Sequence, residues 1–361
     1  MTELDFLDVS GQIFASEQKL FNFVDEEDNL EEVGSNVNLI GSVNNYSTRS
    51  EFFDSIEGSF ERIWQEDEED LELLAAHSDG QAIPYYVYYD DDFPIFITTA
   101  NISDEMPDTI ENFLSTDGNL GRFWISMEEM DRMRAKVVRR NDDVIIPFFT
   151  GHRSAYSDIP SDKRGDIKRT MTYWAEDGRE TYKEMRKKYG ILPTNIRFER
   201  PGEFKFGLKQ KGIVSHQKGS ISNAWDILSG EKDRKKMLKD TINTGGPSIS
   251  KSNVFEDQDI SVAKPWGIQL QSKIDEQAIN TFKLRLSEDR WDLGLSEYQK
   301  VGPSRFSAEI IDNEMYGRTE LEGTKEAIQV YPIDGNDIDP QFRIYNFAQD
   351  HFDSDCQPAR I

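Results

Sequence analysis

The sequence predicts an α+β protein, with a mixed α/β middle domain that carries a meander and basic helices, and a β-rich C-terminal domain. Three observations support this fold class. Ser126 and Glu129 form a capping box in front of an apolar stripe of helical period. Apolar and charged residues alternate over residues 196–208, as they do in half-buried strands. Residues 261–361 contain short β-prone runs punctuated by Gly and Pro.

The 361 residues suffice for two or three domains. The predicted parts are an acidic, partly helical N-terminal region (1–80), a mixed α/β domain with a net-basic surface (81–242), a linker (243–260) and a β-rich acidic domain (261–361). The linker is expected because its residues are mainly Gly, Pro, Ser and other polar types. In the N-terminal region, apolar residues from Phe52 to Trp64 recur at helical spacing and predict one helix.

The middle domain is expected to begin with a hairpin of residues 83–89 and 95–99 around an acidic turn. Asp90, Asp91 and Asp92 in this turn are suited to a divalent cation, although such acids more often face water. The further elements expected in order are a helix from Ser126, a buried strand (144–149), a helix (166–189), the meander (193–214) and a helix (223–242). In the helix over 166–189, Met171, Trp174 and Tyr182 are expected to form the inner face.

The C-terminal domain is expected to be a small antiparallel β domain. Its predicted strands are residues 266–271, 282–286, 306–311, 327–332 and 342–347. No internal repeat is visible in this part or elsewhere in the chain.

Charge is strongly segregated along the chain. Residues 1–120 hold 3 basic and 29 acidic residues, residues 121–240 hold 27 and 18, and residues 241–361 hold 12 and 21. The first third thus has the same net charge as the whole chain, −26, and a net-basic block follows it. A halophilic host would explain acidic surfaces, but it gives no reason for a basic middle third. A polyanionic partner, most often nucleic acid, or an internal contact with the acidic first third would give one.

Several classes of protein are excluded by residue counts and motifs. The single cysteine, Cys356, cannot form an intrachain disulfide or a cysteine-based zinc site, and the four histidines form no local metal motif. No metal site and no cofactor are therefore expected. The acidic start of the chain does not resemble a signal peptide, and no apolar run approaches the roughly 20 residues of a membrane helix. We expect a soluble, cytoplasmic protein without a membrane partner.

The basic block predicts a nucleic-acid-associated accessory or regulatory protein, non-catalytic, that binds phosphates through a surface in residues 121–240. Its candidate contacts are Lys163, Arg164, Lys168, Arg169, Lys183, Lys187, Lys232, Lys235, Lys236 and Lys239. The last four recur at helical spacing and are expected to point outward as a stripe. Trp174, Tyr173 and Tyr182 lie near these residues and could stack on bases, but their spacing favours a place in the core.

A second hypothesis rests on Glu199, Glu203 and Lys205. The last two are spaced as E-x-K on the second strand of the expected hairpin, with another acid close by. This arrangement resembles the core of the PD-(D/E)xK nucleases. The resemblance implies two carboxylates that grip Mg²⁺ and a lysine that orients water or stabilises charge. Glu199 stands where that family usually has Asp, and the match covers fewer than ten residues.

A third hypothesis is a protein-interaction or structural role, in which the basic block is masked internally by residues 1–80. The sequence leaves open whether the chain is an enzyme, whether its partner is a protein or a nucleic acid, and what its oligomeric state is. His216 and Lys218 look like the HxK part of the phospholipase D motif, but Asn223 replaces the aspartate which that motif requires.

Overall fold

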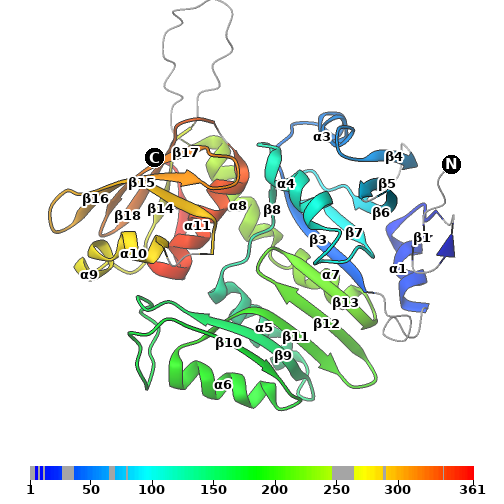
Figure 1. The fold of residues 1–361 in the computed structure, drawn as a ribbon, viewed down its shortest axis with the longest axis horizontal. Coiled ribbons are helices and arrows are strands. Elements are labelled where there is room, and N and C mark those ends of the chain that lie inside the picture. The colour runs from blue at the N-terminus through cyan, green and yellow to red at the C-terminus, as the bar shows by residue number, and fades with distance from the viewer. Residues whose placement is uncertain are drawn as a thin grey trace, which may run out of the picture. The chain divides into compact units, whose positions relative to one another are not determined.

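The computed structural model describes residues 5–6, 9–10, 13–26, 36–64, 70–78, 80–245, 264–287, 290–335 and 337–361 (Figure 1). The chain divides into two compact units. The first unit contains Met1–Gly151, Thr170–Arg186 and Leu192–Lys232, and the second contains His152–Arg169, Lys187–Ile191 and Asp233–Ile361. Within the described ranges, none of the helices is long and apolar enough to cross a membrane.

Most elements of the first unit are strands. They are β1 (Asp5–Phe6), β2 (Val9–Ser10), β3 (Val37–Asn44), β4 (Glu61–Trp64), β5 (Leu71–Ser78), β6 (Gln81–Tyr88), β7 (Ile95–Thr98), β8 (Leu120–Arg122), β9 (Ile145–Arg153), β10 (Arg169–Trp174), β11 (Leu192–Arg200), β12 (Phe204–Lys209) and β13 (Ile213–Gly219). The helices among them are α1 (Glu17–Glu26), α3 (Arg49–Ile56), η1 (Pro107–Glu111), α4 (Asn112–Thr116), α5 (Met127–Arg140), α6 (Gly178–Tyr189) and α7 (Ser222–Ser229).

One large sheet joins the acidic first third of the chain to the basic middle third. Its described strands run in the order β10-β9-β11-β12-β13-β3-β7-β6-β5-β4, and β8 pairs beside them with β3. Strand β3 connects the two parts, because it pairs with β13 on one side and with β7 on the other. Helix α3, the turn η1 and α4 cover the β3–β7 end of the sheet around an aromatic core that includes Phe52, Phe96 and Phe113.

The capping box, the strand after it and the meander form as predicted. The Ser126 hydroxyl accepts the Glu129 amide, and the Glu129 carboxylate accepts the Ser126 amide, so α5 begins at Met127. Strand β9 follows α5. Strands β11, β12 and β13 form an antiparallel meander in which Glu199 lies opposite Lys205. The hairpin of β6 and β7 also forms, and Asp90 holds its turn by accepting two backbone amides.

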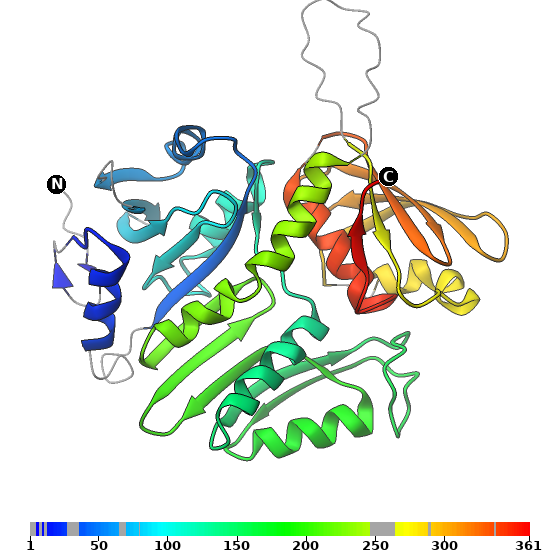
Figure 2. The ribbon, with the colours of Figure 1, turned by 180° about the vertical axis from the view of Figure 1, so that it is seen from behind.

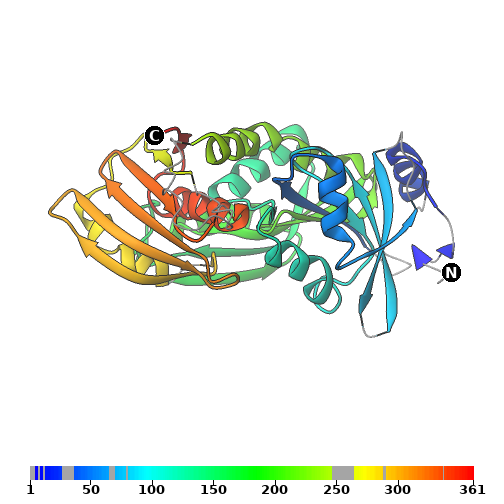
Figure 3. The ribbon, with the colours of Figure 1, turned by 90° about the horizontal axis from the view of Figure 1, so that it is seen from above.

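The second unit contains a separate sheet with the order β15-β16-β17-β18-β14-β19. Its strands are β14 (Trp266–Gln269), β15 (Leu293–Lys300), β16 (Arg305–Asp312), β17 (Arg318–Thr324), β18 (Ala327–Pro332) and β19 (Gln357–Ala359), and its helices are α8 (Lys232–Thr244), α9 (Glu276–Asn280), α10 (Phe282–Ser287) and α11 (Ile338–His351). Figure 3 shows α11 running along one face of this sheet. There Arg343 is fully buried in ion pairs with Asp312 and Asp339, each at 2.8 Å.

The structure confirms the α+β class with two antiparallel sheets. Two of the predicted C-terminal strands are wrong, because residues 282–286 lie in α10 and residues 342–347 lie in α11. Helix α11 is buried on nearly all sides, so its sequence lacks the polar period that marks a surface helix. The predicted domain limits at 80, 242 and 260 stay a prediction, and most of the expected linker lies outside the described residues.

Three predicted helices are shorter than expected. The helix expected to reach Trp64 ends at Ile56, and Glu61–Trp64 form β4. The helix expected from 166 begins only at Gly178, because Arg169–Trp174 form β10. The helix expected over 223–242 is divided at Gly230 into α7 and α8, and the Gly230 amide closes α7 by donating to the Asp226 carbonyl.

Candidate nucleic-acid interface

Strands β9 to β13 have one covered face and one open face. On the covered face, Ile196, Phe198 and Phe206 are buried. Helices α5 and α7 lie over this face in Figure 2, and Figure 1 looks onto the other one. Tyr182 of α6 joins the covered side, with its ring centroid 5.4 Å from that of Phe149. Helix α6 is fixed there because the Tyr182 hydroxyl donates to Asp131 of α5 at 2.9 Å.

The open face carries a group of cations. Arg197 and Glu199 of β11 and Lys205 and Lys209 of β12 are half-buried, whereas Ile196, Phe198, Phe206 and Leu208 are buried. Arg197 and Glu199 therefore share a face with Lys205 and Lys209. The pairing of Lys205 with Lys218 extends this face onto β13. We call Arg197, Lys205, Lys209 and Lys218 the open-face cations.

Trp174 stands at the edge of this open face. It lies on the edge strand β10, and 64% of its surface is exposed. Its ring packs against Phe148 of β9, with ring centroids 4.4 Å apart. The Arg197 guanidinium lies 5.0 Å from the Trp174 centroid and 5.1 Å from the Phe148 centroid. Trp174 was expected in the core, and this expectation is wrong; Tyr182 is buried as expected.

The open-face cations are crowded. Burial lowers the pKa of Lys209, and although Glu111 opposes this, the charges of Arg197 and Lys211 lower that pKa further. Lys211 forms an ion pair with Glu111, which ends η1. A bound anion would relieve the repulsion among these like charges, because each cation favours a negative neighbour.

The structure brings together only two of the three residues of the nuclease hypothesis. The Lys205 ammonium lies 3.7 Å from the Glu199 carboxylate, so these two residues meet as the motif requires. Glu203, however, lies in the turn and pairs with Arg200, which also binds Asp143 at 2.8 Å. Within the described ranges, no group of three or more His, Cys, Asp or Glu residues could hold a metal ion.

A second basic region lies in the second unit, in the loop between β9 and β10. Buried Arg153 organises this loop by donating to the carbonyls of Ile159 at 2.8 Å and Ser157 at 2.9 Å. The Lys163 amide donates to the Lys188 carbonyl at 3.0 Å, which joins the loop to the end of α6. The predicted contacts gathered here, with the cations of the loop exposed, are Lys163, Arg164, Lys168, Arg169 and Lys187. We call these five residues the loop cluster.

The other predicted contacts are not arranged as one surface stripe. Lys235 and Lys239 of α8 are buried, with 1% and 6% of their surface exposed, so their predicted outward orientation is wrong. Lys236 is exposed. Lys232 pairs with Asp90 at 2.8 Å, and the exposed Lys183 of α6 lies 3.8 Å from Glu180.

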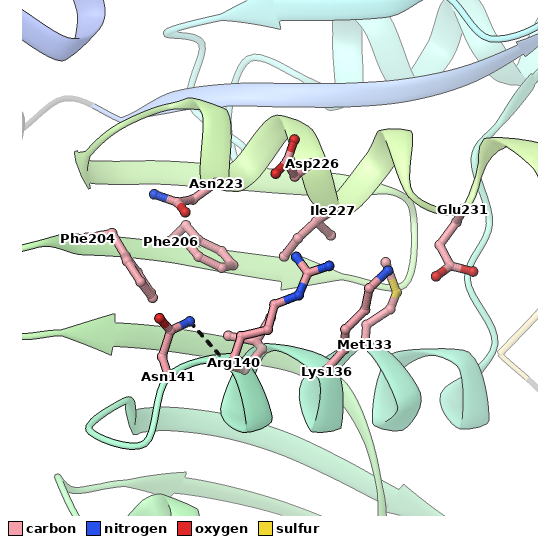
Figure 4. A pocket seen from close by; sticks show the side chains of 11 residues that line it. Met133, Lys136, Arg140, Asn141, Phe204, Phe206, Asn223, Asp226, Ile227 and Glu231 are labelled. Atoms are coloured by element: carbon pink, nitrogen blue, oxygen red, sulfur yellow. Dashed lines mark hydrogen bonds between the residues drawn. The ribbon is translucent and has the colours of Figure 1, made fainter.

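A cavity of about 80 Å³ lies among α5, β12 and α7 (Figure 4). Lys136 and Arg140 extend from α5 toward α7, where Asp226 and Glu231 also line the cavity. Phe204 and Phe206 contribute apolar surface from β12. The volume suits a few water molecules or a small group, far less than the roughly 300 Å³ of a typical ligand pocket.

The comparisons with known proteins give similarities but name no function. A family model, the AF_0896 family middle domain, matches residues 128–211, which extend from α5 to just beyond β12. A protein of Archaeoglobus fulgidus described as uncharacterized is 22% identical over 362 residues, which cover 94% of this chain and 95% of that protein. The similarity therefore extends over nearly the full length of both chains.

Arg197, Lys209 and Lys218 are not among the phosphate contacts predicted from the sequence. These residues are separated in the sequence and become neighbours only through strand pairing. The alternation over residues 196–208 predicts only that the charged residues of the meander share one face. The signal that could have identified the face is this alternation combined with the register, which a sequence alone does not give.

Proposed function

We propose that the chain binds nucleic acid through phosphate contacts on the open face of β9–β13, as a non-catalytic accessory or regulatory protein. The observation that supports this most is that strand alternation gathers Arg197, Lys205, Lys209 and Lys218 on one face of a chain whose net charge is −26. Strong overall acidity repels a polyanion, so a local cationic face concentrates any attraction there. Burial is the main cause that lowers the pKa of Lys209, and the charges of Arg197 and Lys211 contribute to the same direction.

The loop cluster of the second unit offers separate candidate phosphate contacts. Lys163, Arg164 and Lys168 lie on a loop whose carbonyls are held by Arg153, while Arg169 begins β10 and Lys187 lies in α6. Within the cluster, Arg164 lies 3.7 Å from Asp166, an exposed pair that contributes little to stability. Exposed lysine and arginine side chains on such a loop are suited to phosphate contacts without sequence reading.

A second candidate function is the protein-interaction role with an internally masked basic block. Contacts between the first and middle thirds of the chain favour it. Asp25 accepts hydrogen bonds from the Ser220 hydroxyl at 2.9 Å and the Ile221 amide at 2.7 Å, Asp90 pairs with Lys232, and Glu111 pairs with Lys211. The pairs of Asp90 and Glu111 compensate part of the positive charge inside the first unit, whereas Asp25, the contact from residues 1–80, binds only uncharged groups.

The test is fluorescence anisotropy of the full chain with labelled oligothymidylate and labelled duplex DNA, titrated in salt. We expect the logarithm of the affinity to fall linearly with the logarithm of salt concentration, by roughly 0.7 per phosphate contact on a single strand. Reversing two open-face cations in Arg197→Glu/Lys209→Glu should weaken binding about 10- to 100-fold at low salt and flatten the slope by roughly 1.4.

The matched control is Arg305→Glu/Lys325→Glu, which changes the net charge equally in the second unit. It should leave the affinity within about twofold of the unmodified chain, because long-range effects are screened. Equal losses in both double variants would show that only total charge matters and would contradict the proposed face. No binding by the unmodified chain at low salt would favour the masked, protein-interaction role.

A further inference from the structure

We propose that the nucleic acid bound on the open face is single-stranded, and that Trp174 is the platform on which one of its bases stacks. This inference rests on the proposed function and specifies the class of ligand for the same site. It starts from an unusual feature, a tryptophan with 64% of its surface exposed beside crowded cations. A single exposed apolar side chain needs no explanation by itself, but an exposed indole beside Arg197 on a cationic face is suited to a contact with a partner.

The alternation of strand β10 places Trp174 on the open face. Its neighbour Tyr173 turns to the covered face, where its ring lies 5.5 Å from Phe149, and its hydroxyl donates to Asp177 at 2.7 Å. The covered side of β10 is therefore already occupied. Because successive side chains of a strand point to opposite faces, Trp174 must lie on the open face.

The indole is held in place before any ligand arrives. Phe148, itself buried, supports the ring from the next strand, and the Arg197 guanidinium lies beside both rings. A ring fixed from beneath loses little conformational freedom on binding, so it makes a good stacking surface. The Arg197 guanidinium lies over the ring, and the part of Trp174 that stays exposed, 64% of its surface, is available to a planar, π-rich group such as a nucleobase.

The arrangement favours a single strand over a duplex. Bases in a duplex are stacked on each other and present only their edges, whereas an unpaired strand exposes base faces to an aromatic side chain. From Trp174 on β10 the sheet continues through β9, β11 and β12 to Lys218 on β13. With neighbouring strands about 4.8 Å apart, this path is roughly 19 Å long. One base at Trp174 and several phosphates over the open-face cations therefore fit one short, extended oligonucleotide.

The experiment compares labelled oligothymidylate with a duplex of equal length on the full-length variants Trp174→Ala and Trp174→Phe. Base stacking on an aromatic residue accounts for roughly 5- to 150-fold in affinity. We expect Trp174→Ala to lose an amount in this range for the single strand, with an unchanged salt slope, because no phosphate contact is removed. Trp174→Phe should retain part of the affinity. Circular dichroism of each variant verifies the fold.

The outcomes separate this inference from the proposed function. If the unmodified chain binds oligothymidylate and duplex equally and Trp174→Ala changes neither, the stacking role is wrong while phosphate binding stands. If Trp174→Ala weakens both ligands equally, the platform does not select single strands and the inference also fails. If the unmodified chain binds neither ligand at low salt, the proposed function itself fails. Selective loss of single-strand affinity with a constant slope supports the inference.

Discussion

In each of the two sheets one face packs against helices and the other is open, but the two open faces differ in the charged residues that they carry. In both sheets, alternate residues pack against helices, as Phe198 does in the first unit and Phe306 in the second. The open face of β11–β13 carries the open-face cations beside Trp174. The corresponding face of β16 and β17 carries Glu309, Glu320 and Glu322 together with Arg305 and Arg318. Packing of the core determines which residues face outward, but it does not determine the charge of those residues. The charge of an open face therefore indicates the kind of partner that the face would attract.

The largest expected effect is a difference in the free energy of unfolding between a substitution on the covered side and one on the open face. Asp131 of α5 is buried, accepts the Arg134 Nε at 2.7 Å and the Tyr182 hydroxyl, and pairs with Arg186 at 2.9 Å. Asp131→Ala removes the acceptor of the buried Tyr182 hydroxyl and of Arg134, as well as the ion-pair partner of the partly exposed Arg186, and should lower the free energy of unfolding by about 3 kcal/mol. Arg197→Ala on the open face should change it by less than about 0.5 kcal/mol.

Urea unfolding followed by tryptophan fluorescence checks this pair of variants. A shift of the midpoint with Asp131→Ala and none with Arg197→Ala supports the division into a structural and a functional face. Similar shifts in both variants would show that the open face also contributes to the stability of the sheet, and the contrast between the faces would not hold.

The next effect concerns pH and compares buried histidines of the two units. Burial is the main cause that lowers the pKa of His216 to about 4 in the first unit and of His152 to about 3 in the second, where Arg290, Lys168 and His351 add to it. An unfolded histidine titrates near 6.5. As pH falls below 6.5, the unfolded chain takes up protons that the folded chain does not, so stability is lost down to about 4 for His216 and about 3 for His152.

His216→Phe and His152→Phe should therefore reduce the loss of stability in acid. We expect the thermal midpoint of each variant to fall less steeply than that of the unmodified chain between pH 6.5 and 4. Identical slopes in all three proteins would mean that these buried histidines do not determine the response to acid.

The smallest effect tests the acidic face. Glu309 and Glu320 lie directly opposite each other on β16 and β17. Like charges in such a pair are unfavourable, and Glu309→Lys turns the pair into an attractive one. The gain in the free energy of unfolding should be roughly 0.2–1 kcal/mol and should diminish in high salt. A destabilised variant would indicate that Glu309 has a favourable contact which outweighs the repulsion.

Short sequence patterns predicted those helices and strands whose formation depends mainly on interactions between residues near each other in the sequence. The capping box at Ser126 started α5, and the alternation over residues 196–208 formed β11 and β12. The strand predicted over residues 282–286 is wrong because Phe282, Leu284 and Leu286 alternate with Lys283 and Arg285, a pattern typical of a strand. In the structure Arg285 is buried and donates to the His351 carbonyl, and this long-range contact favours the helix α10 over the local pattern.

The candidate site could be predicted only in outline. Counting charges located the basic block, but the block separates into the open-face cations, the loop cluster and the residues of α8, among which Lys235 and Lys239 are buried. The grouping depends on register, and register depends on the whole sheet. Trp174 was misplaced for a similar reason: a strand of six residues offers too short a pattern to distinguish it from the start of a helix.

The central position of β3 imposes an order of events during synthesis. Ile40 of this early strand pairs with Ile213, and the two residues are separated by most of the first unit. Such a pairing closes a long loop and is slow to form, because chain entropy is lost before the contact is gained. On the ribosome, one edge of β3 stays without its partner until β13 has been made. The basic meander is thus the last part of the sheet to be completed, and the acidic first third must avoid aggregation until then.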